Sequence, residues 1–393
     1  MEIQLPDLAL KQIFSFLDLF GLLQASQVNK HWNRIAESDF LWRSLSLQRW
    51  DCSNFTNQHL GTHTWKKFFL HQRRKELRLA LAQPHNFIYK VTKNIAYDME
   101  LAYLSGNSLT MDEQEKSIIC GVSPKQELCA WDVQEGTMIW SSPVQEFYFL
   151  NLVTLPQMHL AITMDRKKTI KVWNCQDRDA LAILRMPESC YGMEAYLTKD
   201  GPFLTVGDAA GNIYTFTLPG LRDVSEVTAS QYGIVFLHCS PDKKWIFACG
   251  TYRRTLPQTI SQGESIVMIR KQCSLKQQHP VDVANVNENS FMKPEFAKEM
   301  EEGSDFDSLA THSGYPWKDP RYVLTTSKNS VHVYMWEEGG RHPYLRSCYR
   351  LENIWHDPTT DDCISSVMCD NASIVLTVTV SEYSMLVMYS LNM

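Results

Sequence analysis

The sequence has no long apolar run, although hydrophobic residue types make up 44% of its 393 residues. No stretch approaches the ~18 consecutive apolar residues that a membrane-spanning helix needs, so we expect no membrane partner. The first residues also lack the features of a secretory signal, because no basic segment is present and the polar pair Lys11-Gln12 interrupts the apolar residues. The composition is that of a globular chain with enough hydrophobic residues for more than one domain.

Paired cysteines are missing as well. The eleven cysteines are scattered along the chain and none forms a Cys-x-x-Cys pair, which argues against a zinc-binding RING module. His59 and His63 are four residues apart, but no third ligand follows, so we predict a polar connector and no metal site. Unpaired cysteines without a secretory signal are typical of reducing compartments. We therefore expect a cytoplasmic protein, with the nucleus as a second compartment.

Signatures of catalysis are also absent. The sequence contains no Gly-rich phosphate loop, and none of its cysteines lies in a local Cys/His arrangement that would activate a thiol. We therefore predict a protein that is not an enzyme, with no catalytic residues and no cofactor.

Basic residues are not in excess, because the formal net charge is -6. This charge argues against nucleic acid as a partner. One basic cluster, Lys66-Lys67 with Arg73 to Arg78, lies in a predicted helix from Thr64 to Ala82. We favour a solvated helix face for this cluster, and a nucleic-acid patch is the alternative.

The first fifty residues carry three helical patterns. One apolar stripe at i, i+3, i+4 and i+7 predicts the first helix, beginning at Pro6, and consists of Leu10, Ile13, Phe14 and Leu17. Asp18 is placed to cap a second helix, and Val28 to Ala36 predicts a third. Three short helices cannot bury all of this apolar surface on themselves, which leaves Leu5, Leu8 and Leu17 without a cover. The alternative is an ordinary helical subdomain packed against the rest of the chain.

These residues resemble the F-box. The family pattern matches here at Leu5-Pro6, Ile13, Leu17, Val28 to Trp32, and Leu41-Trp42, with Leu8 at a position where many members carry Glu. The resemblance implies binding to the Skp adaptor of a cullin-type ubiquitin ligase. It assigns Leu5, Pro6, Leu8, Ile13 and Leu17 to adaptor contact, and Trp32 and Trp42 to internal packing.

From about Asn86 the sequence consists of short β-type segments that repeat. Trp131, Trp173 and Phe216 end equivalent strands and are 42 and 43 residues apart, which matches the ~40–45-residue period of a four-stranded propeller blade. Phe216 to Tyr334 leaves room for two further blades, and Glu337 to Asp362 is expected to be an enlarged loop. Phe87-Ile88-Tyr89 is placed as a lone strand that closes the ring against the C-terminal blade.

This region resembles a WD-repeat propeller, and Thr169 to Asn174 is close to the family's signature strand. The family usually has a turn aspartate two places before that strand, where this chain has Lys125, Lys167, Ala210 and Lys328. We therefore expect degenerate blades, with a generic antiparallel sandwich as the alternative. Residues 255–317 are polar and rich in Gln and Glu, so we expect a largely disordered insert without the outer strands of a blade.

The predicted fold class is thus a multidomain α plus all-β chain. Its parts are an F-box (1–47), a helical linker (48–84) and a degenerate WD-repeat β-propeller (85–393) with an irregular insert at about 255–317. The resemblance implies a substrate-recognition subunit of a Skp–cullin–F-box E3 ubiquitin ligase, with cullin bound through the adaptor. The alternative is a non-catalytic WD-repeat scaffold with a vestigial F-box. Arg166 and Arg253-Arg254 could contact a phosphorylated target, but no motif assigns them, and the substrate-binding residues are unknown.

Overall fold

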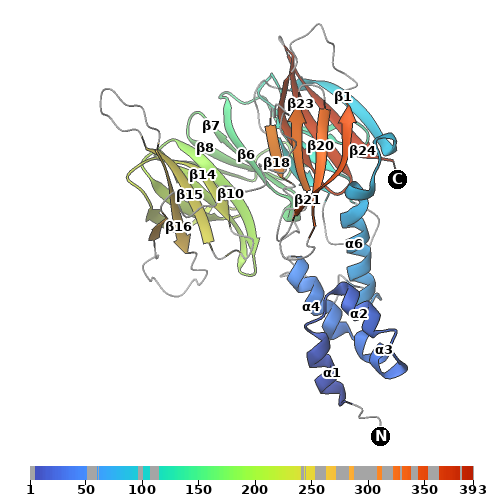
Figure 1. The fold of residues 1–393 in the computed structure, drawn as a ribbon. Coiled ribbons are helices and arrows are strands. Elements are labelled where there is room, and N and C mark those ends of the chain that lie inside the picture. The colour runs from blue at the N-terminus through green and yellow to red at the C-terminus, as the bar shows by residue number, and fades with distance from the viewer. Residues whose placement is uncertain are drawn as a thin grey trace.

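The computed structural model describes residues 5–50, 60, 62–95, 101–106, 115–239, 243, 245–252, 263–270, 283–286, 308–311, 322–327, 330–337, 344–352, 363–380 and 383–392. A helical part at the N-terminus is followed by antiparallel sheets, as Figure 1 shows. The predicted fold class is therefore confirmed.

Four short helices form the N-terminal module. They are α1 (Asp7–Phe14), α2 (Leu19–Ala25), α3 (Lys30–Ala36) and α4 (Asp39–Arg49). The sequence pattern predicted the first three, and it missed α4. This helix forms because its side chains are buried: Leu41 and Trp42 lie in the module core, and the Trp42 indole N–H donates to the Ala36 carbonyl at 2.8 Å.

Side-chain caps and aromatic contacts set the shape of this module. Asp18 accepts from the Gly21 N–H at 2.7 Å and Asn29 from the Trp32 N–H at 2.8 Å, so both caps satisfy amides that the helices leave open. The rings of Phe14 and Trp32 meet edge to face with centroids 5.3 Å apart, which holds α1 against α3.

A long helix, α6 (Trp65–Leu81), connects the module to the sheets, and Figure 1 shows it between the two parts. The predicted helix from Thr64 to Ala82 is confirmed, with Thr64 as its cap. Trp65, Phe68 and Phe69 extend the module core, whereas Leu79 belongs to the core of the C-terminal sheets. One helix thus belongs to both cores. Among the described residues, the short 3-10 helix η1 (Pro84–Asn86) precedes β1, and another, η2 (Pro156–Met158), lies between β6 and β7.

The β region contains six four-stranded antiparallel sheets within the described residues. The first two are β2 (Ala102–Ser105), β3 (Ile118–Val122), β4 (Leu128–Asp132), β5 (Thr137–Ser141); and β6 (Phe149–Leu155), β7 (Leu160–Asp165), β8 (Thr169–Trp173), β9 (Ala182–Arg185). The next two are β10 (Cys190–Thr198), β11 (Gly201–Asp208), β12 (Asn212–Thr217), β13 (Arg222–Thr228); and β14 (Ile234–Cys239), β15 (Trp245–Tyr252), β16 (Gly263–Arg270), β17 (Val283–Val286). The last two are β18 (Ser308–Thr311), β19 (Tyr322–Ser327), β20 (Ser330–Glu337), β21 (Tyr344–Glu352); and β22 (Cys363–Cys369), β23 (Ser373–Val380), β24 (Tyr383–Leu391), β1 (Phe87–Ile95).

The sheets are arranged as propeller blades. The first strands of successive sheets contact each other in the pairs β2–β6, β6–β10, β10–β14 and β18–β22, which places these strands on the inner side. The strand β1 pairs antiparallel with β24, from Phe87 opposite Leu391 onward, so the predicted closing strand is confirmed. The sheet of β14–β17 and the sheet of β18–β21 stand apart in Figure 1.

Three expectations about the later blades are wrong. The strands β16 and β17 pair with their blade inside residues 255–317, where we expected the outer strands to be missing. The strand β18 also lies inside this range, and the remaining residues of the predicted insert lie outside the described residues. Arg253-Arg254, just before the insert, lie outside the described residues as well. The strand β21 occupies part of the expected enlarged loop. Where two further blades were expected between those of Phe216 and Tyr334, the described residues form one, the sheet of β14–β17.

The family position of the turn aspartate holds Lys or Ala in these blades, as the sequence shows, but aspartates at other positions accept the turn amides. Asp165 accepts from the amides of Lys167 and Thr169 at 2.8 and 3.0 Å, and Asp208 accepts from those of Ala210 and Asn212 at 2.9 and 2.8 Å. Asp370 accepts in the same way from Ala372 and Ser373. These aspartates stand three or four residues before the next strand, whereas the usual family position is two residues before it.

The buried carboxylate of Glu76 joins the two parts of the chain. It accepts from Arg49 of α4 at 2.5 and 2.9 Å and from Arg73 of its own helix at 2.7 Å. The Glu76 carbonyl accepts from the hydroxyl of Tyr322 in β19, a fully buried side chain. One residue therefore contacts the module, the linker helix and a blade.

We predict that Glu76→Gln lowers the free energy of unfolding by about 3–5 kcal/mol, because it leaves Arg49 and Arg73 partly buried without their counter-charge. Urea unfolding followed by circular dichroism measures the change. The matched control is Glu37→Gln, which breaks a surface pair with Lys66 and should cost less than about 1 kcal/mol. Equal losses in the two variants would contradict the structural role of Glu76.

Candidate functional site

The predicted contact residues lie on the N-terminal module, and most of them are exposed. Leu8 is 80% exposed, and Leu5, Pro6 and Ile13 are exposed as well. Leu17 is half-buried and packs against the module core. The predicted stripe of α1 therefore divides, because Leu10 and Phe14 face the core whereas Ile13 faces outward.

Three further apolar side chains of the module are exposed. Val28 was part of the family pattern, whereas Phe16 and Phe20 were not singled out from the sequence. Phe16 is 81% exposed in the turn after α1, and Phe20 and Val28 are exposed at the start and beyond the end of α2. We call Leu5, Leu8, Ile13, Phe16, Phe20 and Val28 the N-terminal apolar surface. Helical periodicity could have predicted the exposure of Phe20, because it does not share the face of the buried residues Leu22 and Ala25 in α2.

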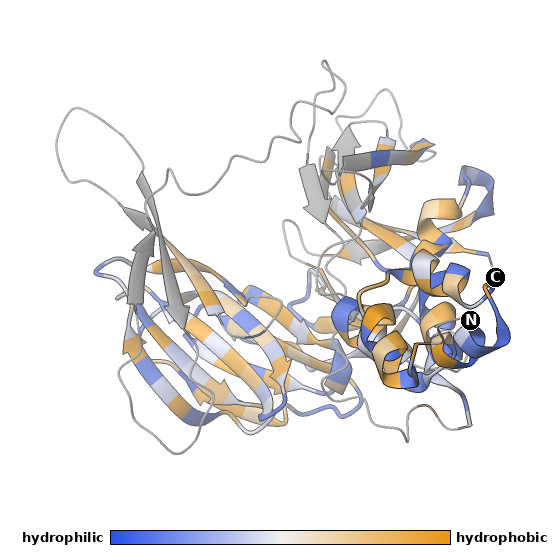
Figure 2. Ribbon diagram, turned by 60° about the horizontal axis from the view of Figure 1, so that its bottom comes forward, coloured by the Kyte–Doolittle hydropathy of each residue, from blue (hydrophilic) through white to orange (hydrophobic). Residues whose placement is uncertain are grey.

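The N-terminal apolar surface is large for a part of the chain that also buries a core of its own. Figure 2 shows that many residues of the N-terminal helices are hydrophobic. A gathering of exposed large apolar side chains is typical of a protein–protein contact. The charged residues nearby are partly paired within the module, because Asp7 binds Arg34 at 2.9 Å and lies 3.5 Å from His31.

Three residues of the basic cluster of α6 are engaged or buried within the structure, whereas Lys67, Arg74 and Arg78 are exposed. Arg73 binds Glu76, Lys75 is buried, and Lys66 pairs with Glu37 and lies 5.4 Å from the centre of the Trp42 ring. A nucleic-acid patch needs exposed, unengaged cations along one face. These contacts favour a structural role for the cluster over the nucleic-acid alternative.

No metal-binding cluster of three or more His, Cys, Asp or Glu side chains occurs among the residues that the structure describes. His59, one of the two histidines considered from the sequence, lies outside these residues. Burial raises the pKa of Cys129 to about 11 and that of Cys190 to about 12, so neither thiol is an activated nucleophile. Within the same described part of the chain, no helix is long and apolar enough to cross a membrane.

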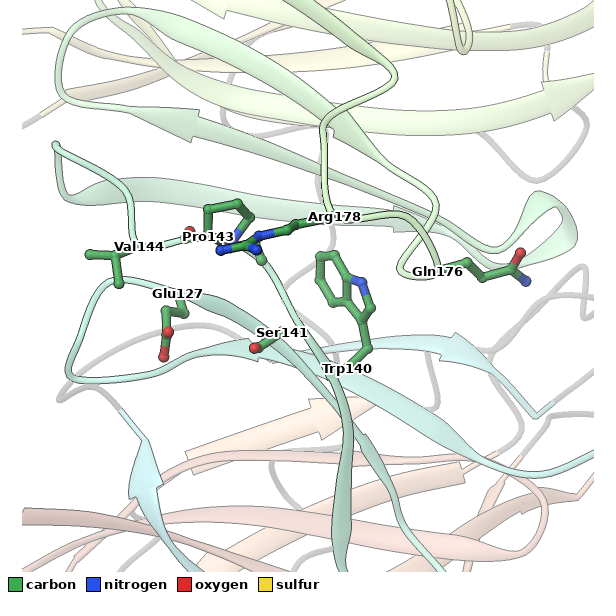
Figure 3. Close-up of a pocket in the computed structure, with 8 residues that line it drawn as sticks. Glu127, Trp140, Ser141, Pro143, Val144, Gln176 and Arg178 are labelled. Carbon is green, nitrogen blue, oxygen red and sulfur yellow. Dashed lines mark hydrogen bonds between the residues drawn. The ribbon is translucent and has the colours of Figure 1, made fainter.

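A cavity of about 640 Å³ lies where β5 meets the β8–β9 connection of the next blade (Figure 3). It is lined by Glu127, Trp140, Ser141, Ser142, Pro143, Val144, Gln176 and Arg178. The Trp140 indole N–H donates to the Asp177 carbonyl at 3.1 Å and its ring contacts Trp173, so this residue joins two blades. We assign no binding role to this cavity.

Comparison with known proteins gives the family. A family model described as F-box-like matches residues 3–48. The chain is 66% identical to F-box/WD repeat-containing protein 12 of Homo sapiens, in an alignment that spans all of both chains. The chain belongs to the F-box/WD repeat-containing proteins. It is also 41% identical over 260 residues to F-box/WD repeat-containing protein 15 of Mus musculus, which covers 66% of this chain and 56% of that relative.

The alignment with the human F-box/WD repeat relative covers 466 positions, 73 more than the 393 residues of this chain. The relative therefore has at least 73 residues that have no counterpart in this chain. This is more than the ~40–45 residues of one blade.

We predict that the two faces of α1 respond differently to truncation. Leu10→Ala should lower the free energy of unfolding by about 2–5 kcal/mol, because Leu10 is 1% exposed in the module core. Leu8→Ala on the same helix should change it by less than about 0.5 kcal/mol. Chemical unfolding monitored by helical circular dichroism measures both, and a large loss in Leu8→Ala would show that this side chain is covered by the chain itself.

Proposed function

We propose that this protein is the substrate-recognition subunit of a Skp–cullin–F-box E3 ubiquitin ligase. The observation that carries the proposal is the N-terminal apolar surface, which remains exposed although the module has a complete core. Family membership and the F-box-like match over the same residues support the assignment.

In this proposal Leu5, Pro6, Leu8 and Ile13 contact the Skp adaptor, and Leu17 supports them from the edge of the core. Phe16 and Phe20 join them, because large exposed aromatics supply much of the binding energy in protein interfaces. The adaptor in turn carries the cullin, so this chain contacts the cullin indirectly.

The proposed contribution of this chain to ubiquitin transfer is proximity, not chemistry. The blades hold a target while the module holds the ligase, so the target lysine and the charged conjugating enzyme meet at high effective concentration. The contacts of Glu76 and the continuous helix α6 support this role, because they fix the direction between the two binding parts. We place this function in the cytoplasm and nucleus.

The adaptor contact is tested by substituting the exposed residues of α1. We predict that Leu8→Asp with Ile13→Asp weakens binding to the purified Skp adaptor by at least about 100-fold, because it puts two charges into an apolar interface. Leu5→Ala with Pro6→Ala should likewise abolish co-purification. Isothermal titration calorimetry with the full chain measures the affinity.

The matched control for this test is Ile183→Asp, which places a charge at an exposed apolar position of β9 far along the chain. Its adaptor affinity should equal that of the wild type. If the wild type does not bind the adaptor, the chain is a WD-repeat scaffold with a vestigial F-box, and the proposal is wrong.

A further inference from the structure

Two buried thiols from neighbouring blades touch each other. The Sγ atoms of Cys120 in β3 and of Cys175, which follows β8, lie 3.8 Å apart, and both residues are free thiols. Non-bonded atoms are in contact at about this separation, so no other atom lies between the two sulfurs. The two residues are 55 positions apart in the sequence, so only the packing of the first blade on the second brings them together.

The packing of the first two blades holds this pair in place. Cys120 lies in a strand that is paired on both sides, and Cys175 belongs to the same hydrophobic cluster. The Trp140 indole of the first blade donates to the carbonyl of Asp177, two residues after Cys175, at 3.1 Å. The two thiols are therefore held next to each other, as a reaction between them requires.

Other buried thiols of these blades have a different kind of partner. Cys129 and Cys190 each donate to a backbone carbonyl oxygen, at 3.7 and 3.3 Å. Cys120 instead contacts a second thiol, and this hydrogen bond with Cys175, together with burial, raises the pKa of Cys120 well above its usual range. Because the thiolate is the reactive form, Cys120 is not the first of the two thiols to react.

Cys175 is the more accessible member of the pair. Its side chain is 9% exposed, whereas Cys120 is completely buried. Cys175 lies in a turn with a φ of 52°, in the left-handed region that residues other than glycine rarely adopt. The next residue, Gln176, lines the cavity of about 640 Å³ between β5 and the β8–β9 connection (Figure 3). A small uncharged molecule in this cavity is thus in contact with the turn that carries Cys175.

We propose that Cys120 and Cys175 form a reversible disulfide when a hydroperoxide oxidises them, and that this bond joins the first blade to the second. A disulfide holds its sulfur atoms about 2.05 Å apart, so the two sulfurs move about 1.8 Å closer when the bond forms. Cys175 supplies this movement because it lies in a turn, whereas Cys120 is held by strands on both sides. The inference goes beyond the proposed function, because it needs neither the adaptor nor a target.

The oxidation proceeds in two steps, with hydrogen peroxide as the oxidant. The Cys175 thiolate first attacks one peroxide oxygen and the O–O bond breaks, so that a sulfenic acid forms and the other oxygen leaves as water after taking up a proton. The Cys120 sulfur then attacks the Cys175 sulfur, and the sulfenic hydroxyl leaves as a second water with the Cys120 proton. In sum, the two thiols lose two electrons and two protons, and the peroxide is reduced to water.

Peptide mapping of the oxidised full chain tests the proposal. Trypsin places Cys120 and Cys175 in the peptides 117–125 and 172–178, each of which contains a single cysteine. The native protein is treated with hydrogen peroxide, its remaining thiols are alkylated in urea, and the digest is examined by mass spectrometry. We expect a linked peptide with the summed mass of both peptides less two hydrogen atoms, and dithiothreitol should separate it into the two peptides.

Substitutions then establish which thiols form the bond. Cys175→Ser and Cys120→Ala should each abolish the linked peptide, and Cys175→Ser keeps the test valid if the core substitution prevents folding. The matched control is Cys129→Ala, which removes an equally buried thiol of the same blade and should leave the yield of the linked peptide unchanged.

The oxidised and reduced forms should also differ in thermal stability. The bond closes a loop of 55 residues between two packed blades, so the oxidised wild type should melt at least about 3 °C above the reduced one. Treatment of Cys175→Ser with peroxide should give no such rise. Melting followed by circular dichroism measures both forms.

Several outcomes overturn this inference. They are no linked peptide from the native wild type, the same mixture of cysteine pairs from the native and the urea-unfolded chain, or an oxidised form that melts no higher than the reduced one. Failure of the proposed function gives a different result, because it concerns adaptor binding alone. Leu8→Asp with Ile13→Asp should therefore form the same linked peptide as the wild type.

Discussion

The arrangement of this molecule depends on a carboxylate that is removed from water between two arginines. Glu76 is almost fully buried, and its desolvation is balanced only because Arg49 and Arg73 together supply charge-assisted hydrogen bonds to both of its oxygens. The same residue accepts from Tyr322 through its backbone. Removal of Arg49, Arg73 or Tyr322 would leave a buried polar group of the joint without a hydrogen bond. The joint between helices and blades therefore has one stable geometry.

This joint gives a physical basis for a recognition subunit with two binding surfaces. The exposed apolar side chains of α1 and α2 lie on one side of it, and the blades lie on the other. A flexible connection would spread their relative positions and lower the effective concentration of a bound target at the ligase. Because α6 takes part in both hydrophobic cores, the two parts stay in one orientation.

The blade turns of the propeller are closed by aspartates even where the family's sequence pattern is incomplete. Asp165, Asp208 and Asp370 close the blade turns by accepting backbone amides, although the spacing we searched contains Lys or Ala. Asp370 also accepts from Ser117 of the adjacent blade at 2.5 Å, which makes the turn an inter-blade contact. The sheets of β14–β17 and β18–β21 stand apart in Figure 1.

The sequence by itself determined the helical module, the linker helix, the repeat of about one blade and the closing strand, because each follows from local periodicity, capping and strand spacing. It also indicated Leu5, Leu8 and Leu17 as uncovered, since a small bundle cannot bury them, and for Leu5 and Leu8 the structure agrees. Only the tertiary structure decided that Leu17 turns inward, that Phe16 and Phe20 stay outside and that Glu76 is the joint. These contacts join residues far apart in the chain, and their energies depend on burial that no local pattern encodes.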